Sequence, residues 1–367
     1  MVPAGILHGP KKGVNVTPPI DGVATSTAAL VGEAGQGPIE QAALVTSLVE
    51  YERAFGTPQS ADELYLGVTQ FFENGGKRAW AVRIRARSAT GISRALAALD
   101  AVDDIGLLCL PGLSGGQALA RAAAYARSRR AFYVAEAAGT RAATLTAVRA
   151  IRPVDRGHAA AYFPHVVLRD PLNPPSTTVC GSSAGVAGLL ARTDSERGVW
   201  AVAAGTGTHL RGAVGLASTL DDRAAAALRG QGVNAIRQVP SHGIVLWGAR
   251  TVGSGTERGE DWKYVPVRRM ALFIEESVER GIEWVDFEPN DEPSWRALRA
   301  TVEAFLEEIR QQGGFAGRTA DESYFVRCGT DTTTQRDIDN GIVVIESGFA
   351  PFRPAEFVVL RIRHKRR

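Results

Sequence analysis

The chain has 367 residues, 45% of them hydrophobic and 22% charged, so it can bury a sizeable core and form two or more domains. Its net charge of +3 is too small for a dedicated nucleic-acid binder, and no run approaches the roughly 18 apolar residues of a membrane span. Its three cysteines are far apart and lack C-x-x-C spacing, which argues against a disulfide scaffold or structural zinc site and favours a reducing cytoplasm.

Residues 1–20 predict an extended N-terminal arm. They are rich in Gly, Pro and Lys, and they lack the apolar core of an export signal. Within the arm, Gly13-Val14-Asn15-Val16-Thr17 alternates apolar and polar residues before two prolines stop the pattern. This predicts a short strand with no obvious partner of its own.

Residues 21–235 predict an N-terminal/middle domain in which strands and helices alternate. Strands are expected at 28–31, 79–85, 105–110 and 132–135, and helices at 41–51, 93–99 and 116–128. This β-α-β-α order predicts an α/β layer with helices packed on a sheet. A Pro-rich break follows at 170–175.

Residues 236–350 predict a C-terminal domain with a second alternation. Strands are expected at 243–249, 283–287, 323–328 and 341–346, and helices at 267–280 and after Ser294 as the N-cap. We therefore predict a mixed α/β fold, with helices covering sheets in two core domains between extended terminal arms.

Residues 351–367 predict a last strand with a basic tail. The residues expected in this strand are Phe357, Val358, Val359, Leu360, Arg361, Ile362 and Arg363. The last seven residues hold five Lys and Arg, and without them the rest of the chain would carry −2 instead of +3. A basic tail on a near-neutral body indicates either an acidic partner surface or a solvated terminus.

Gly181-Ser182-Ser183-Ala184-Gly185 fits the G-x-S-x-G motif of a hydrolase nucleophile elbow, with Ser183 as the nucleophile. An Asp and a His follow in acceptable order, but no H-G-G-G segment offers an oxyanion hole. The motif is short in a chain with 40 glycines, so a chance match is the stronger interpretation and a serine hydrolase the alternative.

No other motif predicts a cofactor or a metal. The sequence lacks G-x-x-x-x-G-K-[ST] and G-x-G-x-x-G, and its six histidines show no ligand spacing. The two unpartnered terminal strands are the remaining unusual feature, because an open strand edge is hazardous unless something completes it. Strand addition to another copy would complete it, and a head-to-tail contact that does not close builds a helical filament.

The chain resembles the tail sheath proteins of contractile phage tails and related contractile injection systems. The matching segments lie in the family's order along nearly the whole chain. They are VATSTAALVGEAGQGPIEQAALVTSLVEYERAFG from Val23, VTQFFENGGKRAWAVRI from Val68, SSAGVAGLLARTDSERGVWAVAAG from Ser182, AIRQVPSHGIVLWGARTV from Ala235, WKYVPVRRMALFIEESVERGIEWVDFEPND from Trp262 and PAEFVVLRI from Pro354. The Ser183 motif then overlaps a structural turn of the family by chance.

The resemblance implies a non-enzymatic structural subunit without cofactor or metal. It implies a homo-oligomer of hexameric rings stacked helically around an inner tube protein, with baseplate and terminal cap proteins as further partners and no nucleic-acid binding or membrane insertion. The N-terminal arm and the C-terminal strand would act as linking strands that add to neighbouring subunits, through residues 13–17 and 357–363. Arg336, Lys365 and Arg366 are candidate tube contacts. Assembly is expected in the cytoplasm, as part of a phage tail or phage-tail-like particle. A baseplate- or cap-adjacent sheath paralogue is an alternative within the same class.

Overall fold

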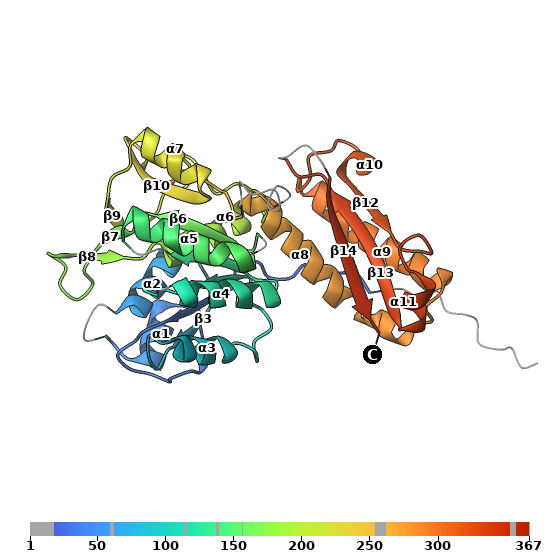
Figure 1. Ribbon diagram of the computed structural model, residues 1–367, viewed down its shortest axis with the longest axis horizontal. Helices are drawn as coiled ribbons and strands as arrows, with labels where there is room; N and C mark the ends of the chain where they lie inside the picture. The colour runs from blue at the N-terminus through green and yellow to red at the C-terminus, as the bar shows by residue number, and fades with distance from the viewer. Residues whose placement is uncertain are drawn as a thin grey trace, which may run out of the picture.

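The computed structural model describes residues 18–58, 62–113, 116–136, 139–155, 157–253, 262–352 and 357–366. They form two units, and helix α8 (Val265–Gly281) runs between them (Figure 1). The first unit contains an eight-stranded and a three-stranded sheet, and the second contains another three-stranded sheet. The predicted mixed α/β fold, with helices packed on sheets, is therefore confirmed.

The eight-stranded sheet has the order β11-β10-β6-β5-β4-β1-β3-β2. Its strands are β1 (Ala28–Gly32), β2 (Ala42–Val45), β3 (Ala79–Arg83), β4 (Leu107–Cys109), β5 (Phe132–Glu136), β6 (Ala159–Phe163), β10 (Val233–Val239) and β11 (Gly243–Leu246). The six central strands are parallel, and the edge strands β2 and β11 are antiparallel to their neighbours. Parallel strands need covering helices on both faces, which explains why β1, β5 and β6 are buried at every residue.

Helices cover both faces of this sheet. Successive residues of a strand point to opposite faces, so Leu107 packs with α2 (Glu63–Glu73) and α6 (Ser183–Arg197). Leu108 packs on the other face. The helices of that second face are α3 (Ala89–Ala97), α4 (Gly116–Ser128) and α5 (Arg141–Asp155). The shorter helices α1 (Leu48–Phe55) and α7 (Asp222–Gly230) lie against β2 and β10.

A small antiparallel sheet extends from the first unit. It has the order β8 (Thr177–Cys180), β7 (Val166–Arg169), β9 (Ala213–Leu216). The β7–β8 hairpin protrudes at the far left of Figure 1, away from the second unit.

The second unit packs two long helices on one face of an antiparallel sheet. The helices are α8 and α9 (Glu292–Gln311), and the sheet has the order β12 (Tyr324–Arg327), β13 (Ile342–Phe349), β14 (Val358–Lys365). Ile274 and Val278 of α8 share a core with Val302 of α9 and Ile345 of β13. Two short helices, α10 (Ala320–Ser323) and α11 (Gln335–Asp339), complete the unit.

Two predicted elements and one predicted helix cap are wrong. Residues 41–51 form β2 and the start of α1 instead of one helix, because the Ser47 side chain caps α1 by accepting from the Glu50 backbone N–H. Residues 283–287, predicted as a strand, form a 3₁₀ helix (Glu283–Phe287) after α8. The N-cap of α9 is Asp291 instead of Ser294.

The predicted domain boundaries also change. A boundary after residue 235 falls inside β10, which pairs with both β6 and β11 in the eight-stranded sheet. The first unit therefore continues through β11, and the second begins near α8. Residues 358–365 are likewise no separate arm here, because they form β14 of the second unit.

Candidate functional site: the domain junction and the C-terminal sheet

Ser183, the residue of the hydrolase-like motif, is the first residue of α6 and is fully buried. Its hydroxyl donates a 2.7 Å hydrogen bond to the carboxylate of Glu136 at the end of β5. A hydrolase nucleophile is exposed and hydrogen-bonded to a histidine. Ser183 has neither property among the described residues, so the geometry gives the hydrolase interpretation no support.

Glu136 is a buried structural carboxylate that ties β5 to its neighbours. It accepts a 2.7 Å hydrogen bond from the Gly112 backbone N–H in addition to the one from Ser183. Burial raises the pKa of Glu136, while the nearby His165 and these hydrogen bonds oppose that shift. A Cβ at Gly181 would fall 1.9 Å from a Glu136 oxygen. Because that carboxylate is buried and held by two hydrogen bonds, it cannot move aside easily, which favours glycine in the turn before α6.

A buried ion pair joins the two units. The Arg269 guanidinium on α8 donates to both Asp194 oxygens on α6, at 2.8 and 2.6 Å. The two side chains are only 5% and 7% exposed. The Thr25 hydroxyl donates to Asp194 at 2.6 Å, and Arg269 donates to the Thr25 carbonyl at 3.0 Å. Each charge thus has several partners, which a buried pair needs in order to be tolerated.

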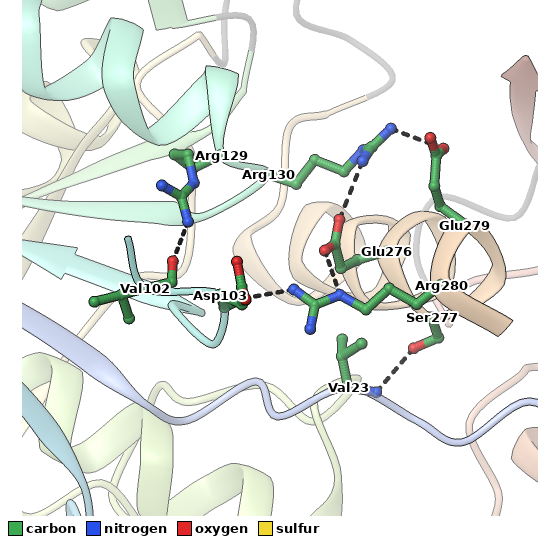
Figure 2. A network of polar contacts seen from close by, with 9 residues as sticks. All are labelled: Val23, Val102, Asp103, Arg129, Arg130, Glu276, Ser277, Glu279 and Arg280. Atoms are coloured by element: carbon green, nitrogen blue, oxygen red, sulfur yellow. Dashed lines mark hydrogen bonds and ion pairs between the residues drawn. The ribbon is translucent and has the colours of Figure 1, made fainter. Parts of the chain in front are cut away.

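A second, more exposed polar network surrounds the same junction (Figure 2). Arg130, just before β5, bridges Glu276 and Glu279 of α8 at 3.1 and 3.0 Å. Arg280 pairs with Glu276 at 2.7 Å and also donates to the Asp103 carbonyl. The figure shows α8 held from both sides, because the Val23 backbone N–H donates to Ser277 Oγ at 3.0 Å.

The C-terminal strand has a partner in its own chain, contrary to the expectation from sequence. β14 pairs with β13 in antiparallel register from Val358 opposite Phe349 to Lys365 opposite Ile342. The sheet order places β14 at an edge, so among the described residues its second side is unpaired. That open edge is the surface on which another strand could add. The other predicted linking segment, residues 13–17, lies outside the described residues.

β14 alternates strictly between buried and exposed residues. Val358, Leu360 and Ile362 enter the core, whereas Val359 is 51% exposed and Phe357, just before the strand, is 41% exposed. The exposed face also carries Arg361, Arg363 and Lys365. Of these, Arg363 pairs with Asp337 of α11 at 2.6 Å, and Thr334 and Arg363 together hold the pKa of Asp337 below its usual value.

The three candidate tube contacts differ in their surroundings. Arg336 is exposed on α11, and Lys365 is exposed at the end of β14. Arg366 already forms hydrogen bonds within the chain, because its guanidinium donates to the Val285 carbonyl at 3.1 Å and to the Glu288 carbonyl. Arg336 and Lys365 are therefore the two candidates that remain accessible.

The described part of the chain shows no group of three or more His, Cys, Asp or Glu side chains suited to a metal ion. Nor does any helix within it combine the length and apolar character required to cross a bilayer. The polar groups of the junction and the open edge of β14 instead suit mechanical coupling and assembly.

Two family models match the chain. The phage tail sheath protein central domain matches residues 86–252, and the phage tail sheath C-terminal domain matches residues 257–365. Together they cover most of the chain and divide it close to where the structure does. No curated protein sequence matches.

Solved structures extend this likeness to the full length. The chain is similar to the contracted sheath complex of PVC, an extracellular contractile injection system, with 27% identity and a TM-score of 0.79. It is similar to the contracted helical sheath of the anti-feeding prophage, with 25% identity and a TM-score of 0.79. It is also similar to a chain of the anti-feeding prophage baseplate, with 25% identity and a TM-score of 0.77. In each comparison 98% of both chains is covered.

Proposed function

The chain belongs to the phage tail sheath family and is a structural sheath subunit, and we propose that it polymerises as stacked rings of six around an inner tube. Contraction of that sheath would drive the tube through a target envelope. The observation that carries the proposal is the full-length likeness to sheaths of contractile injection systems in the contracted state.

The energy for contraction would come from the assembly itself. An extended sheath is a trapped, metastable lattice, and contraction reaches a lower free energy through new contacts between subunits. A gain of about a few kcal/mol per subunit, summed over many copies, supplies a large driving force without nucleotide. The chain would therefore act without enzymatic activity.

Linking strands would hold the lattice together during this rearrangement. The open edge of β14 is long enough, at eight residues, to accept a further strand from a neighbouring copy. Residues 13–17 are the proposed strand. Backbone hydrogen bonds to a flexible arm survive rotation of the rigid units, which suits a sheath that must not fall apart.

The further partners would be the tube, the baseplate and a terminal cap, in a particle assembled in the cytoplasm. Arg336 and Lys365 are the proposed contacts to an acidic tube surface. A sheath paralogue that lies next to the baseplate is the second candidate function, because the chain is also similar to a chain of a baseplate structure.

The test is negative-stain electron microscopy of the purified chain, alone and co-expressed with its tube protein. Hollow striated cylinders are expected, contracted when no tube is present. A chain that stays monomeric under both conditions would contradict the proposal.

A further inference from the structure

An apolar cleft opens between the two units at the N-terminal end of α8. Its volume is about 680 Å³, and its walls include Trp200, Trp247, Met270 and Phe352. Several of the apolar side chains that line the cleft are open to solvent. Trp247 is 38% exposed, Phe352 is 58% exposed and Val202 is 51% exposed. A concave apolar surface left open to water is typical of a binding site.

The charged side chains that the structure describes at the rim of this cleft are all basic. Arg197, Arg229 and Arg250 line it, and the described lining residues include no Asp or Glu. Among the described residues, none of the three arginines forms an ion pair, and only Arg197 is seen to donate to a nearby carbonyl, that of Val202 at 2.9 Å. The complementary occupant is therefore an apolar side chain flanked by carboxylates.

The chain carries such a group on the 3₁₀ helix that follows α8. Phe287 is 90% exposed, the highest value among the exposed large apolar side chains of the described chain. Glu283 and Asp291 are exposed on either side of it in the sequence, and Glu288 follows it directly. In the described part of the chain, none of these three acids forms an ion pair.

Phe287 is uncovered but firmly held. Its neighbour Asp286 pairs with His364 of β14 at 2.8 Å, with both side chains only 10% exposed. The preceding Val285 is buried, and its carbonyl accepts from Arg366 at 3.1 Å. Because the backbone on its N-terminal side is fixed in this way, Phe287 is presented at a defined place, which lowers the entropy lost when it binds.

Phe287 and the cleft cannot meet within one copy. The cleft is lined by Pro266 and Val267 at the start of α8, whereas Phe287 follows the end of the same helix at Gly281. A helix of 17 residues spans about 25 Å. We propose that Phe287 of one copy inserts into the cleft of the next, with its acidic neighbours facing the arginines of the rim.

This contact rests on the proposed sheath function and specifies one of its subunit interfaces. Because the two surfaces differ, the contact is heterologous and propagates from copy to copy without closing on itself. Charge favours Phe287 over the N-terminal arm of a neighbour as the occupant of the cleft. Residues 1–17 contain two lysines and no acid, so the basic rim would repel them.

The experiment compares the wild-type chain with four full-length variants and measures, by sedimentation and electron microscopy, the concentration at which cylinders form. Phe287→Ala removes the anchor and is expected to raise that concentration about 30-fold. Val49→Ala, on the exposed surface of α1 at 63% exposure, is the matched control and should leave it unchanged.

Charge reversal tests the same contact independently. Glu283→Lys with Glu288→Lys should weaken assembly, and adding Arg229→Glu and Arg250→Glu to the same chain should restore it. The contact would be overturned if the Phe287→Ala chain assembles normally, or if adding the two Arg→Glu substitutions does not restore assembly. Neither result would contradict the sheath function. A wild-type chain that never assembles would contradict the sheath function, and with it this contact.

Discussion

Loss of Asp194 should strongly destabilise the junction between the two units. Asp194→Ala leaves the Arg269 guanidinium, only 5% exposed, with the Thr25 carbonyl as its remaining described partner. Removing one member of a buried ion pair typically costs about 3–5 kcal/mol, because the other charge stays buried without compensation. We expect a loss of that size in the free energy of unfolding.

The assay is urea denaturation at concentrations below those that support assembly. Arg130→Ala is the matched comparison at the same junction. Its side chain is 39% exposed and its pairs with Glu276 and Glu279 are open to solvent, so each should contribute no more than about 1 kcal/mol. A double variant, Asp194→Ala with Arg269→Met, should recover much of the stability that Asp194→Ala loses.

Two results would refute this reasoning. The first is a loss below about 1 kcal/mol for Asp194→Ala, since a buried pair would then behave like an exposed one. The second is a double variant no more stable than the single one, since the cost would then come from lost packing rather than from the uncompensated charge.

Four further predictions follow from other parts of the structure. Ser183→Ala should lower the unfolding free energy by about 1–3 kcal/mol, because buried Glu136 loses a donor, yet leave cylinder formation intact; lost assembly with unchanged stability would contradict this. Gly181→Ala should cost about 3 kcal/mol or prevent folding, because its Cβ would overlap the Glu136 carboxylate, and a normal urea midpoint would exclude that clash. Burial raises the pKa of Glu136 above its ordinary value of 4.5, so the folded state binds a proton at this carboxyl more tightly than the unfolded state does. This tighter proton binding stabilises the folded state fully below pH 4.5, and the stabilisation is lost as the pH rises through the folded-state pKa. The stability of Glu136→Gln relative to wild type should therefore increase as the pH rises above 4.5 in urea titrations, and a pH-independent difference would contradict the buried titration. Arg336→Glu should weaken co-sedimentation with the tube protein, and unchanged co-sedimentation would remove Arg336 from the tube contact.

The sequence predicted best those helices and strands in which apolar residues recur at regular spacing. The helix at 116–128 was predicted with the bounds that the structure has, and the strands at 28–31 and 132–135 differ by one residue. The missed boundary at 41–51 had a local signal, since Ser47 and Glu50 have the spacing of a helix N-terminus. Periodicity alone could not separate a four-residue strand from the helix that follows it.

Long-range contacts decided the elements that the sequence did not reveal. Residues 283–287 alternate like a strand, but Asp286 is fixed by His364, which lies 78 residues further along the chain. The pairing of β14 with β13 and the ion pair between Asp194 and Arg269 likewise join distant segments. No spacing rule connects such residues, so the junction that couples the two units was invisible before the fold was known.

The most direct test of a contractile sheath is helical reconstruction by cryo-electron microscopy of the chain assembled on its tube and again after the tube is released. We predict two lattices built from the same subunit fold, a longer and narrower one with the tube and a shorter and wider one without it, interconverting with no nucleotide present. A single lattice with unchanged length and diameter under both conditions would contradict the account.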